Sequence, residues 1–134
     1  MQITLFSDYG LRTMMWLALH PERMNSVREI ADHHNISFNH LTKVARRLAE
    51  LGYIRSMKGK GGGIILNKDA ATVRLGDLVL ALEANMHIAE CFDPATNTCR
   101  LTKDCRLKHF LNDASDAFIA SLNGHTLADC HATN

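Results

Sequence analysis

Three cysteines fall within fifteen residues of this sequence, at Cys91, Cys99 and Cys105 in the segment CFDPATNTCRLTKDC. An odd number of cysteines does not suit a disulfide framework, and the segment has no Cys-x-x-Cys pair. Cysteine thiolates are the ligands of structural zinc and of iron–sulfur clusters. The segment therefore predicts a metal or cluster site that is one ligand short of four.

The spacing of these cysteines leaves three kinds of chemistry open. Structural zinc prefers cysteines two to four residues apart, and spacings of seven and five do not match, although His109 could supply a fourth ligand one helical turn after Cys105. Iron–sulfur clusters accept wide spacing because their ligands bind different irons. A thiol redox switch is the third possibility.

The composition indicates one cytoplasmic domain, or a small domain with an oligomerisation element. The chain has 134 residues, 46% of them hydrophobic, and a net charge of +1. Asp8 and Arg12 interrupt the apolar N-terminus, which lacks the basic start of a signal peptide. No stretch approaches the roughly 20 apolar residues that span a bilayer, so we expect no membrane partner and a reducing compartment.

Basic side chains gather in the middle of the sequence. Residues 43–60 hold Glu50 as their only acidic residue, against Lys43, Arg46, Arg47, Arg55, Lys58 and Lys60. Such a local patch on a nearly neutral protein is typical of a nucleic-acid-binding surface, although a solvated helix face would have the same composition.

Three helices are expected before this patch ends. Residues 5–19 are apolar on nearly all sides, which predicts a largely buried helix that stops at His20-Pro21. The motif SVRE predicts a capping box, with the Ser26 hydroxyl on an amide and Glu29 reaching back, at the start of a helix over 27–34. Ser37 can cap a third helix that runs to about residue 51 and ends at Gly52.

The third helix has a buried side and a polar side. Leu41, Val44, Leu48 and Leu51 form the apolar stripe. The opposite side carries amide and charged groups, flanked by further polar residues: Asn39, Lys43, Arg46 and Glu50, with His40, Thr42 and Arg47 beside them. Two short helices joined by a tight turn, the second with a basic outer face, predict a helix-turn-helix.

A glycine-rich hairpin follows this motif. Residues 53–57 and 64–66 are strand-like and are separated by KGKGGG, which predicts a wing that contacts DNA. A nucleotide-binding loop is disfavoured because the glycines lead into Ile-Ile-Leu rather than into a helix. The predicted DNA-binding residues are Ser37, Asn39, His40, Lys43, Arg46, Arg47, Lys58, Lys60, Gly61 and Gly62.

Two further helices are expected, over residues 73–83 and from Leu107 onward for about 17 residues. The second has an apolar seam of Leu107, Leu111, Ala114, Phe118 and Leu122. Such a seam favours pairing with a second copy, although it could instead pack on the chain's own core. The predicted fold is mainly α with a small β-hairpin wing: a winged helix-turn-helix over 1–83, a cysteine loop over 84–105, and a dimerisation helix with its tail over 106–134.

Several ordered motifs resemble one protein family. SDYGLR, KGKGGGIIL, RLGDLVLALE, the cysteine segment with RLK after it, and TLADC are similar to the Rrf family of bacterial winged-helix regulators. Within the family, ECFDPATNTC is most similar to its nitric-oxide-sensing repressors. The resemblance implies a dimeric repressor in the bacterial cytoplasm that binds double-stranded operator DNA and releases it when its cluster is nitrosylated.

The resemblance also implies a ligand set. Cys91, Cys99 and Cys105 would bind a 4Fe–4S cluster, and Asp8 of the partner subunit would be the fourth ligand. Lys108 stands where related regulators with a 2Fe–2S cluster carry a histidine, which favours 4Fe–4S over 2Fe–2S. Cys130 and His109 are the competing fourth ligands.

The wing departs from the family pattern at one position. Lys58 stands where many relatives have arginine, which weakens the expectation of a planar group in the minor groove. No nucleophile–base constellation is visible among the scattered histidines, so we expect no enzyme. The alternative function is an iron–sulfur-homeostasis or redox-sensing regulator of the same family with a 2Fe–2S cluster, or a DNA-binding protein with structural zinc.

Overall fold

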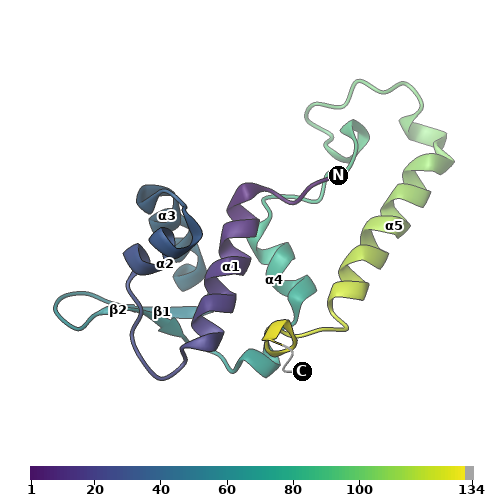
Figure 1. The fold of residues 1–134 in the computed structure, drawn as a ribbon. Helices are drawn as coiled ribbons and strands as arrows, with labels where there is room; N and C mark the ends of the chain where they lie inside the picture. Colours follow the sequence, from purple (N-terminus) through teal and green to yellow (C-terminus); the bar gives the residue numbers. More distant parts are fainter. Residues whose placement is uncertain (132–134) are drawn as a thin grey trace.

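Five α-helices and one two-stranded antiparallel sheet make up the computed structural model, which describes residues 1–131 (Figure 1). The elements in chain order are α1 (Leu5–Leu19), α2 (Val27–His34), α3 (Phe38–Glu50), β1 (Ile54–Met57), β2 (Gly63–Leu66), α4 (Leu75–Leu82) and α5 (Arg106–Leu122). This order confirms the predicted winged helix-turn-helix with a long C-terminal helix. The end of the predicted C-terminal tail, residues 132–134, lies outside the described residues.

The helix-turn-helix forms because each helix begins at a side-chain cap. The Ser26 hydroxyl accepts a hydrogen bond from the Glu29 amide at 3.0 Å, and the Ser37 hydroxyl accepts one from the His40 amide at 3.1 Å. Only half of the predicted capping box is present, because the Glu29 carboxylate accepts from Arg23 at 2.8 Å instead of reaching back to Ser26. The exposed guanidinium outcompetes the backbone amide for this carboxylate.

The wing is a short hairpin fixed to the helices by a backbone bridge. In β1–β2, Ile54 pairs with Leu66 and Met57 pairs with Gly63. The Ile64 amide donates to the Asn25 carbonyl at 2.7 Å, which ties β2 to the segment before α2. A Cβ atom on Gly63 would lie 2.4 Å from that carbonyl, at a φ of +138°, so the bridge requires glycine.

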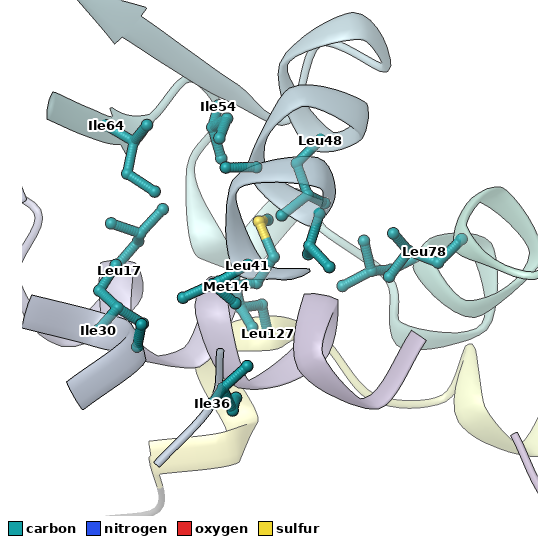
Figure 2. Packing of buried hydrophobic residues seen from close by; sticks show 14 of the residues in the cluster. Met14, Leu17, Ile30, Ile36, Leu41, Leu48, Ile54, Ile64, Leu78 and Leu127 are labelled. Atoms are coloured by element: carbon teal, nitrogen blue, oxygen red, sulfur yellow. The ribbon is translucent and has the colours of Figure 1, made fainter. Parts of the chain in front are cut away.

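The core lies where α1 crosses α3, α4 and the hairpin. Its fully buried side chains include Met14, Leu17, Ile30, Leu41, Leu48, Leu78 and Leu127 (Figure 2). The prediction that α1 is largely buried is wrong on one side of the helix, since Leu5 is 63% exposed and Leu19 is 57% exposed. Arg12, seven residues from each of them and therefore on the same side, is also exposed, so this side of α1 faces solvent.

One end of α5 is anchored to α4. The Asp77 amide donates to Asn123 Oδ1 at 2.9 Å, and Asn123 Nδ2 donates to Asp77 Oδ1 at 3.0 Å. This bond and the neighbouring Arg74 lower the pKa of Asp77. A Cβ atom on Gly76 would lie 2.5 Å from Asn123 Oδ1 and from the Ile119 carbonyl, so a glycine is needed for this close approach.

The remainder of α5 stands apart from the body of the chain (Figure 1). No residue of this helix is buried, and Leu107 and Phe110 at its N-terminal end are 61% and 58% exposed. Between α4 and α5 the chain forms a long loop with two short 3-10 turns, Glu90–Phe92 and Thr102–Asp104. Within residues 1–131, no helix combines the length and apolar character that crossing a bilayer requires.

Candidate DNA-binding surface and cysteine site

The outer face of α3 presents exposed polar and cationic side chains. Asn39, Lys43 and Arg46 are exposed, while Leu41 and Leu48 on the other side of the helix are fully buried. Among the described residues, neither Lys43 nor Arg46 makes an ion pair. Two uncompensated cations beside an amide suit phosphates and base edges.

The other predicted residues of α3 have partners within the chain. Ser37 is exposed, but its hydroxyl is occupied in capping the helix. His40 is half-buried and its ring packs edge-on against Tyr9 of α1, with centroids 4.9 Å apart. Arg47 is exposed and lies 3.5 Å from Glu50. His40 therefore links α3 to α1, a contact that its position in the sequence did not indicate.

The tip of the wing carries the remaining predicted residues. Lys58, Lys60 and Gly61 are exposed and Gly62 is half-buried. Gly61 has a φ of +78°, and the Gly62 amide donates to the Gly59 carbonyl at 3.0 Å, which closes the turn. The glycines make a tight tip, and the two lysines stand on it without ion pairs in the described part of the chain.

The three cysteines lie along the loop between α4 and α5. Cys91 is half-exposed in the turn Glu90–Phe92, Cys99 is exposed, and Cys105 is half-exposed at the residue that precedes α5. All the cysteines are free thiols. Within residues 1–131 of the single chain, no three His, Cys, Asp or Glu side chains are grouped closely enough to hold a metal ion.

The loop is held by its own polar side chains. Glu90 accepts hydrogen bonds from the amide and hydroxyl of Thr98, and Asp93 accepts from the Ala95 amide at 3.0 Å. These bonds lower the pKa of both carboxyls. Asn97 Oδ1 accepts from the Cys99 amide at 2.9 Å. Local turns therefore give the loop its present shape.

Asp8 lies in the first turn of α1, where the sequence placed it. Its carboxylate accepts from Arg12 Nη2 at 2.8 Å and from Arg12 Nε at 3.3 Å, one helical turn away. The two side chains are 33% and 44% exposed. The next residue is Tyr9, whose ring packs on His40 of α3, so a short stretch of α1 carries both the candidate ligand and a contact to α3.

The two competing fourth ligands have different surroundings. His109 is exposed on α5, one turn after Cys105. Cys130 is half-buried, and burial together with nearby Asp129 raises the pKa of its thiol. A raised pKa disfavours the thiolate form that binds metal.

An aromatic cluster on α1 and α2 was missed from the sequence. The Trp16 ring lies 4.5 Å from the His20 ring and 4.7 Å from the His33 ring, and the His33 and His34 rings are 4.9 Å apart. Burial, with His33 and Arg12 nearby, lowers the pKa of His34, and Asp8 acts in the opposite direction. The adjacent His33-His34 pair was the only signal of this cluster.

An apolar groove separates α5 from α1 and α4. Its volume is about 230 Å³, and its walls include Ile3, Leu11, Val79, Phe118, Leu122 and Leu127. Two of the five seam residues predicted on α5, Phe118 and Leu122, line this groove. Of the other three, Leu107 and Ala114 are exposed and Leu111 is half-buried.

A helix-turn-helix whose second helix has a cationic outer face, followed by a lysine-bearing hairpin, defines the winged-helix class of DNA-binding proteins. The sequence profile of the Rrf2 family, described as an iron-dependent transcriptional regulator, matches residues 3–133. The chain belongs to the Rrf2 family of transcriptional regulators, and the predicted resemblance is confirmed.

Individual relatives are also regulators. The chain is 43% identical over 130 residues to the HTH-type transcriptional regulator NsrR of Shouchella clausii, covering 96% of this chain and 87% of that protein. It is 41% identical to NsrR of Bacillus subtilis, covering 96% and 89%. The chain is thus an NsrR-like transcriptional regulator and, as predicted, not an enzyme.

Solved structures show the same fold. The global cysteine regulator CymR of B. subtilis superimposes with a TM-score of 0.77 at 26% identity, covering 97% of this chain and 95% of that one. IscR of T. potens superimposes with a TM-score of 0.77 at 23% identity, covering 97% and 85%.

Proposed function

We propose that this chain is a nitric-oxide-responsive repressor of the bacterial cytoplasm. It binds operator DNA as a homodimer while a 4Fe–4S cluster is bound and releases the DNA when nitric oxide attacks the cluster. The similarity to regulators named NsrR and the resemblance of ECFDPATNTC to nitric-oxide-sensing repressors support this function.

The donor set carries this proposal. One loop supplies three unpaired and solvent-reachable thiols, at Cys91, Cys99 and Cys105, which are not grouped with one another in residues 1–131 of the single chain. Three thiolates fit three corners of a cubic iron–sulfur cluster and leave one iron for a different ligand. When bound, such a cluster supplies iron that reacts with nitric oxide.

The loop has to change shape to hold this group. Its turns are made by exposed hydrogen bonds of Glu90, Asp93 and Asn97, which water can replace at little cost. Bringing three thiolates together therefore does not require unfolding the core. The sections of chain on either side, α4 and α5, would stay in place at Asp77 and Asn123.

Asp8 of the partner subunit is the proposed fourth ligand. In the single chain Asp8 is paired with Arg12 on the surface of α1, and an exposed pair of this spacing contributes only about 0.3–0.5 kcal/mol. The carboxylate can thus leave Arg12 for iron at small cost. A carboxylate oxygen is also a weaker ligand for cluster iron than a thiolate. This suits an iron at which nitric oxide has to replace the protein ligand.

The dimer would form through α5. Leu107 and Phe110 are exposed, and the groove beside Phe118 and Leu122 is apolar. Fully burying one such side chain contributes about 1.5–3 kcal/mol, so pairing of two α5 helices has a driving force of adequate size. The same pairing would bring the cysteine loop of one subunit towards the partner.

Residues of α1 provide a route from the cysteine site to the DNA surface. Asp8 is followed by Tyr9, and the Tyr9 ring packs on His40 within α3. A change in the partners of Asp8 therefore acts on the helix that supports α3. By thermodynamic linkage, bound DNA should stabilise the form of the protein in which Asp8 is a ligand of the cluster.

The decisive experiment compares three states of one preparation. Anaerobically purified protein should contain about four irons and four sulfides per chain. It should shift DNA selected from a random pool in a gel, and the shift should be lost in cluster-free protein and after a nitric oxide donor. Equal affinity in the three states would refute the sensing role, and one zinc without sulfide would refute the cluster.

A further inference from the structure

Phe38 is a large apolar side chain at the start of the recognition helix. It is the first residue of α3 and is 39% exposed, whereas Leu41 and Ala45 on the neighbouring side of the helix are buried. At 100° per residue, Phe38 lies between the buried stripe and the polar face that holds Asn39 and Arg46. The ring therefore borders the face that we assign to DNA.

Arg28 of α2 holds this ring from one side. The Arg28 guanidinium carbon lies 4.2 Å from the centre of the Phe38 ring. Arg28 is exposed and, among residues 1–131, makes no ion pair. A guanidinium that stacks on an aromatic face keeps its N–H edges free for a phosphate. The pair thus combines a fixed apolar surface with an uncompensated cation.

The surroundings of the pair point to DNA as its partner. Lys43 and Arg46, on the same helix, are also exposed and without ion pairs in the described chain. In helix-turn-helix proteins the N-terminal residues of the second helix contact base edges in the major groove. Phe38 is at that end. The one apolar group that the major groove offers there is the 5-methyl group of thymine.

We propose that Phe38 contacts the 5-methyl group of a thymine in each half-site and that Arg28 contacts a phosphate of the same half-site. This inference rests on the proposed binding of DNA through α3. It adds a sequence preference to that function: the site recognised by this chain contains a thymine whose methyl group, and not only its hydrogen-bonding edge, contributes to affinity.

The test of Phe38 removes the methyl group from DNA. The preferred site is first selected from random DNA with anaerobically purified, cluster-loaded protein. Each thymine is then replaced by deoxyuridine, which lacks the methyl, and the dissociation constant is measured by fluorescence anisotropy. At one thymine per half-site we expect an affinity loss of about fourfold, the size expected for one buried methyl-sized group.

Protein variants show whether Phe38 makes this contact. In Phe38→Ala the same replacement should have no effect, and in Phe38→Leu, which keeps an apolar side chain, part of the loss should remain. Phe38→Gln, which retains side-chain length without an apolar face, serves if the alanine variant is poorly folded, as judged by circular dichroism. If deoxyuridine lowers the affinity of Phe38→Ala and Phe38→Gln as much as that of the wild type, Phe38 does not contact the methyl group.

The test of Arg28 uses salt dependence. Arg28→Gln should reduce the slope of log affinity against log salt by about 0.9 per half-site, the effect of one phosphate contact. Arg74→Gln is the matched control, because Arg74 is exposed but paired with Asp77 at 2.9 Å on α4. Equal slopes for Arg28→Gln and the wild type would overturn the phosphate contact.

The outcomes separate this inference from the function on which it rests. If wild-type protein selects a site and Lys43→Ala and Arg46→Ala weaken binding, but no thymine methyl depends on Phe38, only the present inference fails. If wild-type protein selects no site, the DNA-binding function and this inference both fail.

Discussion

Asp8 and Arg12 form a two-point ion pair across one turn of α1, with Arg12 Nη2 2.8 Å and Nε 3.3 Å from the two carboxylate oxygens. The pair is partly exposed, so it holds the carboxylate in a defined orientation without a large free-energy cost for its release. A carboxylate held in this way is available to a second partner.

The first prediction concerns this pair. Asp8→Ala should make cluster loss at least about tenfold faster, since it removes a ligand. Arg12→Gln should change the rate by no more than about threefold, because it removes only a weak competitor. Transfer of iron to a ferrous chelator under anaerobic conditions measures both rates. Equal rates in Asp8→Ala and wild type would exclude Asp8 as a ligand.

The second prediction concerns the four cysteines. The iron content should be far below four per chain in each of the variants Cys91→Ser, Cys99→Ser and Cys105→Ser, because a hydroxyl is a poor ligand for cluster iron. Cys130→Ser should keep the full iron content, since the Cys130 thiol lines an apolar groove and its pKa is raised. Iron and acid-labile sulfide analysis decides the matter. Loss of the cluster in Cys130→Ser would make Cys130 the fourth ligand.

The third prediction compares three cations of α3. Lys43→Ala and Arg46→Ala should each weaken DNA binding by about tenfold, because both side chains are exposed and unpaired in the described structure. Arg47→Ala should have a smaller effect, since Arg47 lies 3.5 Å from Glu50 and is partly compensated. Anisotropy titrations at several salt concentrations measure these effects. If Arg47→Ala weakens DNA binding more than Lys43→Ala and Arg46→Ala do, the DNA contact lies on the side of α3 that carries Arg47.

The fourth prediction concerns association through α5. Leu111→Glu places a charge in the apolar seam and should raise the dimer dissociation constant by at least about tenfold. Ala120→Glu is the matched control, because Ala120 is exposed and lies on the opposite side of the helix. Sedimentation equilibrium distinguishes the two. If both variants remain dimers, the subunits pair through another surface.

The fifth prediction concerns acid stability. His34 has a lowered pKa, chiefly because of burial, and its Nε2 atom is buried without a hydrogen-bond partner in residues 1–131. As the pH falls through the ordinary histidine pKa of 6.5, His34 is protonated in the unfolded chain before it is protonated in the folded chain. The free energy of unfolding therefore decreases below this pH, until His34 is protonated in the folded chain as well.

Urea titrations of cluster-free protein between pH 8 and pH 5 measure this effect. His34→Gln should flatten the pH dependence below about pH 6.5. His125→Gln, a change at an exposed histidine, should not. An unchanged profile in His34→Gln would assign the acid sensitivity to other groups.

Local sequence signals predicted the DNA-binding part of the fold well. Ser26 and Ser37 cap their helices as expected, and the glycine-rich tip separates two strands. These features depend on residues that are neighbours in the chain. The direction of the Glu29 side chain was not predictable, because it depends on Arg23 in the preceding loop.

Contacts between distant elements could not be obtained from one sequence. The Tyr9–His40 and Arg28–Phe38 contacts join separate helices, and no periodicity indicates which rings meet. The cysteine segment was recognised by residue type and spacing, but its present shape follows from turns at Glu90 and Asp93. Side-chain hydrogen bonds of this kind compete locally and leave no repeating pattern.

The attachment of α5 at Asn123 has a mechanical consequence. The helix has 17 residues and is about 25 Å long, so its fixed end and Cys105 are at opposite ends of a stiff rod. A rotation of about 5° at Asn123 would move Cys105 by about 2 Å, by simple geometry of a rod of that length. A change in the shape of the cysteine loop would therefore be expected to change the angle of α5 about its attachment at Asp77 and Asn123.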